Sequence, residues 1–294
     1  MNPIAQAKPF PIPVLAVGFG APAEDESLDY LPMPSGMATF QSPILPEPEE
    51  IAARAGALRV LDETQAALQR AVAGEPVGPI MLHGLSAADL KLLNQVLGEG
   101  EVSAQVLEGP TPTLGHARVQ ESVYAGVWRV FELTGDGQVL DRIEVGAVPA
   151  LLQQAAQEDA RAARPPHTPV PEGVQNAPAV LVELEDHRQQ WRAGQMSQVV
   201  NLTLLPMSLA DIAWLDHVLG TGRVLILSRG YGNCRITNTC VPNTWRVVYY
   251  NSQDTVILNT VEVTAIPEVA CAAPEDLADS LERLREVLEW VQQG

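Results

Sequence analysis

Leu85-Ser86-Ala87-Ala88-Asp89-Leu90 returns later in the chain as Met207-Ser208-Leu209-Ala210-Asp211-Ile212. In both hexapeptides an aspartate follows a serine by three residues. This spacing is typical of a helix start, where the serine side chain caps the first turn and the acidic side chain accepts the backbone N–H of the serine in return. Two helices with matching starts indicate that the chain contains an internal repeat.

Three further pairs of segments recur in the same order after these hexapeptides. They are Val96–Gly100 with Val218–Gly222, Val127–Val130 with Thr244–Val247, and Val139–Val145 with Ile257–Val263. Strand-like segments joined by short links favour antiparallel meanders. We therefore predict an α+β (mixed α/β) fold, a tandem duplication of an α-β-α-β-β-β-α unit related by a pseudo-two-fold axis. Whether the two meanders pair with each other is left open.

The repeat and the proline content divide the chain into four segments. We predict an extended, acidic, proline-rich arm over residues 1–48, a first repeat unit over 49–164, a linker over 165–172 and a second repeat unit over 173–294. The linker is predicted from its dense prolines. The first unit is expected to open with one helix from Pro48 to Gly74. An amphipathic helix is expected over about residues 274–292.

The composition excludes several classes of partner. Lys and Arg number 18 against 36 Asp and Glu, which gives a net charge of −18. Nucleic acids and anionic membrane surfaces select clustered basic residues, so neither is an expected partner. The N-terminal residues lack the pattern of a signal peptide, and no apolar run approaches the roughly 18–20 residues of a membrane span. We predict a cytoplasmic protein without membrane insertion, whose charge favours a basic partner.

Catalytic and metal-binding signatures are not found in the sequence. The five histidines are scattered, and there is no His-x-x-x-His, Cys-x-x-Cys or Gly-x-Ser-x-Gly motif. We therefore predict no catalytic residues, no bound metal and no cofactor, and we expect the protein not to be an enzyme.

The two copies differ most after the first meander strand. The second copy there reads Ser228-Arg229-Gly230-Tyr231-Gly232-Asn233-Cys234-Arg235-Ile236. Its candidate partner-binding residues are Arg229, Gly230, Tyr231, Gly232, Asn233 and Arg235. The alternative is a glycine-rich hairpin turn whose arginines pair with surface acids.

Cys234 and Cys271 are the candidate functional thiols. Cys271 comes shortly before a predicted helix that starts near Pro274, and a thiol near a helix N-terminus has a lowered pKa. The alternative for both residues is a small apolar side chain in the core.

Four segments of the second copy resemble the HupH/HyaF family of hydrogenase expression proteins. They are Ser228–Ile236, Asn243–Ser252, Ile257–Val263 and Pro267–Ala273. Gly18-Phe19-Gly20, Leu31–Pro34 and Met37 in the N-terminal arm are similar to that family as well. The resemblance implies a maturation factor for uptake [NiFe]-hydrogenase without established catalytic activity. It also implies cytoplasmic action on the iron–sulfur small subunit before twin-arginine-dependent export.

The leading hypothesis is a chaperone that holds the hydrogenase small-subunit precursor, with other maturation factors as further candidate partners. The strongly negative charge agrees with a basic leader as ligand. A second hypothesis is a thiol-dependent factor that assists iron–sulfur cluster assembly or protection. A third is a non-catalytic oligomeric adaptor, and a homo-oligomer is also open.

Overall fold

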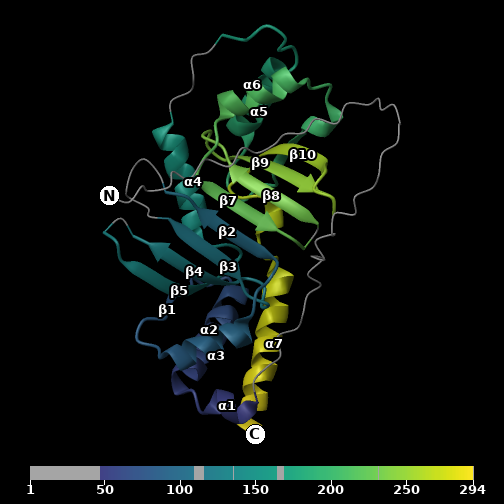
Figure 1. Cartoon of the computed structure of the whole chain (residues 1–294). Coiled ribbons are helices and arrows are strands. Elements are labelled where there is room, and N and C mark those ends of the chain that lie inside the picture. The colour runs from purple at the N-terminus through teal and green to yellow at the C-terminus, as the bar shows by residue number, and fades with distance from the viewer. Residues whose placement is uncertain (1–46, 109–115, 135, 164–168, 231, 294) are drawn as a thin grey trace, which may run out of the picture. The chain divides into compact units, whose positions relative to one another are not determined.

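The structure is a computed structural model that describes residues 47–108, 116–134, 136–163, 169–230 and 232–293 (Figure 1). The predicted N-terminal arm, apart from residues 47 and 48, lies outside the described residues. The helices are α1 Pro48–Ala52, α2 Ala55–Val72, α3 Ala87–Leu97, α4 Ala150–Ala162, α5 Ala177–Gln190, α6 Leu209–Leu219 and α7 Pro274–Gln293, with 3-10 turns η1 Leu202–Leu204 and η2 Glu268–Ala270.

The strands follow the same order in the two halves of the chain. The first half contains β1 Ile80–Met81, β2 Val102–Val106, β3 Ala117–Glu121, β4 Val127–Leu133 and β5 Val139–Val145. The second half contains β6 Gln198–Asn201, β7 Val224–Ser228, β8 Asn233–Asn238, β9 Thr244–Tyr250 and β10 Val256–Val263.

Within the described residues, these strands form one ten-stranded sheet in the order β1-β5-β4-β3-β2-β7-β8-β9-β10-β6. Every neighbouring pair is antiparallel. The two meanders meet where β2 pairs with β7, and Ala104 lies opposite Ile226 at the middle of that pair. Because equivalent strands follow in mirrored order on both sides of this pair, the pseudo-two-fold axis passes through it. The predicted α+β class, duplication and antiparallel meanders are confirmed.

One detail of the predicted unit differs. The predicted unit counts three meander strands, whereas each described meander has four, because the segments near 119–124 and 127–133 form two separate strands, β3 and β4. Between them the chain turns at Tyr124 and at Gly126, whose φ of 80° lies in the left-handed region that glycine adopts readily. The side chain of Glu121 accepts the Gly126 N–H at 3.1 Å and holds this turn.

The single helix expected from Pro48 to Gly74 is also wrong, because α1 ends at Ala52 and α2 begins at Ala55. Ile51 and Ala57 are both fully buried in one cluster. In a continuous helix, with 100° per residue, their side chains would point about 120° apart. The break at Arg54 lets both enter the same core.

The sheet has two differently covered faces. We call the side that carries Trp128 and Trp245 the Trp face, and its central strands are covered by α4 and η2 in a continuous apolar cluster. The indole N–H of Trp128 donates to the Gly146 carbonyl oxygen at 2.9 Å. The equivalent N–H of Trp245 reaches the Thr264 and Ala265 oxygens, both at 3.2 Å.

We call the opposite side the groove face, and helices cover it only at its two ends. Ile143 of β5 packs there against α2, α3 and α7, and Val261 of β10 packs against α5 and α6. Between these two clusters, side chains of the central strands are exposed, including Gln105, Arg118 and Arg235. The centre of the groove face is therefore the part of the sheet that the described helices leave open.

The helices that close the two copies pack beyond their own copy. Leu284 and Leu288 of α7, from the second copy, lie in the core of the first copy together with α2 (Figure 1). Asp159 of α4, from the first copy, accepts the Nε–H of Arg223 at 2.6 Å and an amide hydrogen of Asn238 at 2.9 Å. The two copies are therefore interlocked as well as joined through the sheet.

Both predicted helix starts are confirmed. Ser86 and Asp89 form a reciprocal capping box at α3, and Ser208 and Asp211 form one at α6. No helix in the described part of the chain combines the length and apolar character needed to cross a membrane.

Candidate functional site

The turn between β7 and β8 carries the predicted partner-binding residues. Arg229 and Gly230 are exposed, and the Arg229 N–H donates to the backbone oxygen of Glu101 at 3.1 Å. A Cβ at Gly230 would lie 2.0 Å from a carboxylate oxygen of Glu101, so glycine lets Glu101 approach closely. The turn of the second copy is thereby fastened to the first copy.

Gly232, Asn233 and Arg235 lie at the start of β8 and are exposed as well. The guanidinium of Arg235 stacks over the Tyr250 ring, 4.7 Å from its centroid, a cation–π arrangement that fixes the long side chain. Tyr231 lies outside the described residues. Among the described candidates, the structure brings Arg229, Gly230, Gly232, Asn233 and Arg235 together on the solvent side of one hairpin.

The two candidate thiols lie on the other side of the sheet. Cys234 alternates with Arg235 along β8, so its side chain enters the buried cluster of the Trp face. Burial raises the pKa of the Cys234 thiol to about 12. Cys271 packs against the same cluster, so the thiols and the exposed arginines do not share a surface.

The expectation that a helix N-terminus lowers the pKa of Cys271 is wrong. Burial, together with the negative charges of Glu268 and Glu121, raises the pKa of this thiol to about 11. Its Sγ lies 3.6 Å from the Pro267 oxygen, and the residue caps the end of the 3-10 turn η2, before α7 begins at Pro274. Neither thiol has the electropositive surroundings that activate a cysteine.

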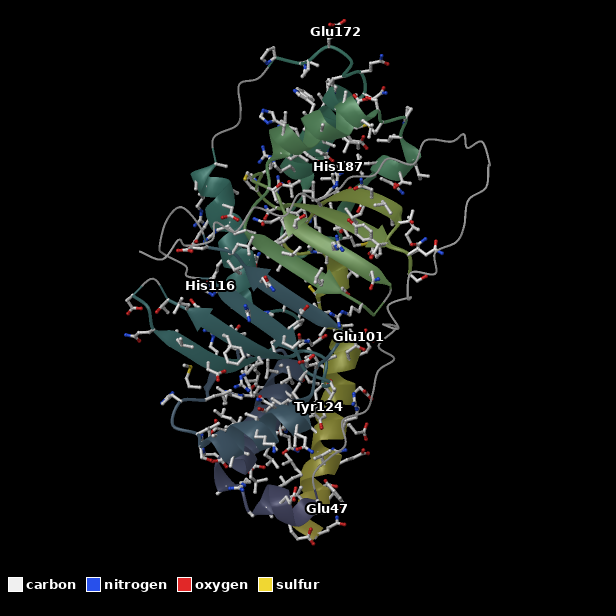
Figure 2. All side chains as sticks on the ribbon, viewed as in Figure 1. Glu47, Glu101, His116, Tyr124, Glu172 and His187 are labelled. Atoms are coloured by element: carbon white, nitrogen blue, oxygen red, sulfur yellow. The ribbon has the colours of Figure 1, made fainter. Side chains whose placement is uncertain are left out.

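A groove of about 720 Å³, here called the central groove, lies on the open part of the groove face. Its lining includes Ser103, Gln105, Arg118, Gln120, Phe131, Leu225 and Leu227. His116 and Glu99 also line it. Figure 2 shows His116 and Glu101 toward opposite ends of the central strands, which form the floor between them.

Two arginines on the groove face hold the helices at its ends. The guanidinium of Arg129 donates to Asp141 through Nε at 2.5 Å and to Asn94 of α3 at 2.8 Å. In the second copy Arg246 pairs with Asp216 of α6 at 3.2 Å. These matched contacts connect strand to helix in each copy and give both arginines a structural role.

Two other arginines, Arg118 and Arg235, are the exposed pair of the groove face. They lie opposite Phe131 and Val248 in the two halves, respectively. Sequence reasoning selected Arg235 and missed Arg118. Arg118 precedes Trp128 by the same number of residues as Arg235 precedes Trp245. Aligning the two copies on these tryptophans would therefore have identified Arg118 as the counterpart of Arg235.

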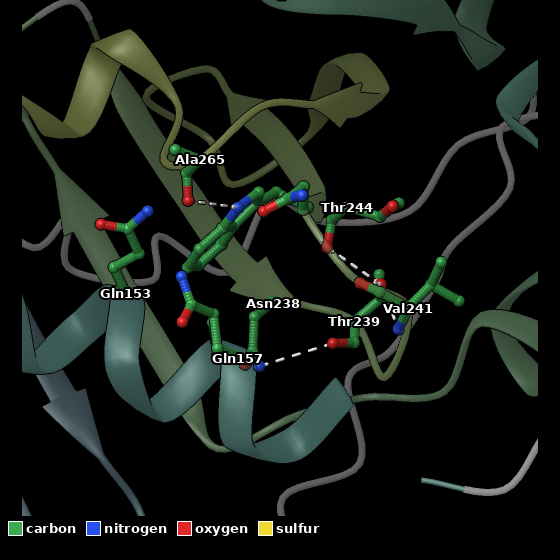
Figure 3. A pocket seen from close by; sticks show the side chains of 10 residues that line it. Gln153, Gln157, Asn238, Thr239, Val241, Thr244 and Ala265 are labelled. Carbon is green, nitrogen blue, oxygen red and sulfur yellow. Dashed lines mark hydrogen bonds between the residues drawn. The ribbon is translucent and has the colours of Figure 1, made fainter. Parts of the chain in front are cut away.

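A much smaller cavity lies on the Trp face between α4 and the β8–β9 hairpin (Figure 3). Gln153 and Gln157 of α4 and Thr239 border it, and its volume of about 10 Å³ is close to that of one water probe. It is a packing gap between the halves rather than a ligand site. Within the described residues, no three His, Cys, Asp or Glu side chains are grouped so as to hold a metal ion.

Glu121 is a buried carboxyl group at the junction of the sheet and α7. It is 6 % exposed, and burial raises its pKa from 4.5 to about 7. The hydrogen bond from Gly126 opposes this shift, whereas Glu101 and Asp276 add to it. Since the folded protein then binds a proton that the unfolded chain releases between those values, stability decreases as the pH rises from about 4.5 to 7.

We expect Glu121→Gln to remove most of this pH dependence. The variant should be more stable than the parent at pH 8, by up to about 3 kcal/mol, and close to it at pH 4.5. Urea unfolding at both pH values measures the difference. Glu99→Gln, at an exposed position, serves as the control for a lost charge. Equal stability changes at the two pH values would contradict a raised pKa of Glu121.

The duplication seen in the fold is also present in the match of the chain to a family model. The model of the HupH hydrogenase expression protein, C-terminal conserved region, matches the chain twice, at residues 55–167 and 174–291. The chain therefore belongs to the HupH hydrogenase expression protein family, with one conserved region in each repeat.

Individual relatives cover nearly the whole chain. The hydrogenase expression/formation protein HoxQ of Cupriavidus necator is 54 % identical, over 96 % of this chain and 98 % of that protein. HupH of Rhodobacter capsulatus is 47 % identical over 94 % of this chain and 96 % of that protein. The hydrogenase-1 operon protein HyaF of Escherichia coli is 31 % identical over 94 % of this chain and 95 % of that protein. A solved HupH from Thiobacillus denitrificans aligns with 27 % identity, 39 % of this chain, 93 % of that chain and a TM-score of 0.35.

Proposed function

We propose that this protein is an accessory factor of [NiFe]-hydrogenase maturation that holds the iron–sulfur small-subunit precursor in the cytoplasm before export. The observation that carries the proposal is the full-length similarity to hydrogenase expression/formation proteins. A holding role needs an exposed contact surface rather than a reaction centre. The β7–β8 turn, with Arg229, Gly230 and Asn233 in the open, is the proposed contact.

The charge of the chain supports a basic client segment. The net charge is −18, and exposed carboxylates follow the solvent side of α7 at the helical spacing of Glu275, Asp279 and Glu282. A twin-arginine leader is positively charged, so association should be accelerated electrostatically and weakened by salt. The surface charge would steer the precursor, and the turn would supply local contacts.

Binding of the purified small-subunit precursor to the full-length protein tests the proposal. We expect affinity to fall at least about tenfold, equivalent to about 1.4 kcal/mol, in Arg229→Ala/Asn233→Ala, and to fall with rising salt. Arg59→Ala/Gln189→Ala, at exposed positions of α2 and α5, is the matched control. Unchanged hydrogenase activity after deletion of the gene, or no binding at low salt, would overturn the proposal.

The same assay separates the thiol-dependent alternative. Since both thiols are packed against the Trp face and have raised pKa values, Cys234→Ser/Cys271→Ser should still bind the precursor. Loss of hydrogenase maturation with intact binding would favour thiol chemistry instead. The stoichiometry of the complex separates the adaptor hypothesis, because an adaptor with two equivalent halves would bind two clients per chain.

A further inference from the structure

The central groove exposes apolar side chains that the fold itself does not need at the surface. Phe131 is 42 % exposed and Val139 is 69 % exposed, and both line the groove. Leu225 and Leu227 of β7, at the centre of the sheet, are half-buried on the groove floor. Exposed apolar side chains gathered in one groove are typical of a surface that binds another protein segment.

The charges in the groove identify the chemistry of that segment. Arg118 and Arg235 have no carboxylate within ion-pair distance among the described residues, whereas Arg129 and Arg246 on the same face are paired. In a chain of net charge −18, Arg118 at the groove and Arg235 next to it, opposite Leu227 on the neighbouring strand β8, are two guanidinium groups without an ion pair to a described carboxylate. Arginine binds carboxylates through two parallel hydrogen bonds, so these groups select acidic side chains.

The strand register sets the spacing of the two arginines. Arg118 lies in the same row as Gln105, Leu225 and Thr237, while Arg235 lies in the row of Leu227 and Ser103. Three strand spacings and a two-residue offset separate their Cα atoms by about 16 Å. An extended peptide covers that distance in four to five residues. Its middle residues would lie over Leu225 and Leu227.

We propose that the central groove binds an extended segment of a partner protein in which two acidic side chains, four or five residues apart, flank apolar residues. The inference goes beyond the proposed function, because a basic leader would meet two like charges here. Glu99 at the groove and Glu101 beside Gly230 disfavour a continuous acidic run, so the selected pattern is two separated acids. Client capture at the turn and peptide capture in the groove are distinct events.

Fluorescence anisotropy with the full-length protein and a labelled synthetic peptide containing Asp-Leu-Thr-Val-Asp tests this site. We expect the peptide to bind, and the same peptide with Asn or Lys in place of both Asp residues to bind at least about tenfold more weakly. Arg118→Gln/Arg235→Gln should lose at least about tenfold in affinity for the Asp peptide. Arg59→Gln/Arg285→Gln removes the same charge from exposed helix positions and should bind like the parent.

A charge-reversal variant distinguishes a change in charge selectivity from a general loss of structure. Arg118→Glu/Arg235→Glu should lose the Asp peptide and gain the Lys peptide, which a general loss of structure would not produce. Equal binding of the Asp and Asn peptides, or equal losses in the groove and control variants, would overturn the proposal. These outcomes do not depend on the small-subunit precursor, so failure here is distinguishable from failure of the proposed function.

Discussion

Replacement of Asp211 by alanine is expected to lower the free energy of unfolding by about 4 kcal/mol. The Asp211 carboxylate is 0 % exposed, and it accepts hydrogen bonds at the N-termini of two helices, α5 and α6. One oxygen accepts the N–H groups of Gln175, Asn176 and Ala177 at 2.8, 2.8 and 3.0 Å, where α5 starts. The other accepts the N–H of Ser208 at 3.0 Å and completes the capping box of α6. Alanine would leave these donors without a partner.

The repeat supplies a matched control for this substitution. Asp89 occupies the same place in the first copy, but it is partly exposed and accepts one distant N–H, from Ala57 at 3.4 Å, besides its capping box. Asp89→Ala should therefore cost only about 1 kcal/mol. Urea unfolding of both variants measures the difference, and equal losses would show that the second helix contact of Asp211 contributes nothing.

The pH dependence of the Asp211 effect follows from its charge. Burial alone would raise the pKa of the carboxyl, but hydrogen bonds from Ser208 and from backbone N–H groups outweigh it and hold the pKa far below its usual value. The stabilisation is then complete above the unfolded pKa of about 3.9 and is lost as the pH falls through the folded pKa. The difference in free energy of unfolding between the parent and Asp211→Ala should therefore decrease below about pH 4.

Local signals in the sequence predicted much of the fold. The Ser-Asp spacing fixed the starts of α3 and α6, since a capping box is formed by neighbours within one turn. The recurring Trp128 and Trp245 placed two equivalent strands, because both indoles fill the same kind of position on the Trp face. The pairing of β2 with β7 was not predictable, because either meander edge presents similar unpaired backbone groups.

The candidate site was predicted only in part, because local sequence patterns do not determine which distant residues become neighbours. The glycines and polar residues of this stretch predicted an exposed turn, and the described residues Arg229, Gly230, Gly232 and Asn233 are exposed. The faces of Cys234 and Arg235 depended on strand register, which a single sequence does not fix. The surroundings of Cys271 depended on Glu121, a residue far away in the chain. The central groove became visible only when the two halves were joined.

Division of the chain between residues 164 and 165 is expected to leave two fragments that fold only together. The first fragment would lack α7, whose Leu277, Leu284, Leu288 and Val291 complete its core. Each buried side chain of this kind contributes about 1.5–3 kcal/mol, so the four together approach the whole stability of a typical domain. The second fragment would lose α4, with the Asp159 contacts to Arg223 and Asn238.

Co-expression of the two fragments, one carrying an affinity tag, measures this dependence. We expect a co-purifying one-to-one complex with the circular dichroism spectrum of the intact protein, and aggregation or lack of structure for either fragment alone. In the intact chain, Leu284→Ala should cost about 3 kcal/mol, whereas Trp290→Ala, at an exposed position of the same helix, should cost less than about 1 kcal/mol. A soluble, cooperatively unfolding first fragment would contradict the interlocked arrangement. The central groove depends on that arrangement, because its lining strands β2 and β7 come from different halves, as do Arg118 at the groove and Arg235 on the neighbouring strand β8. Peptide binding should therefore return only when the fragments are combined.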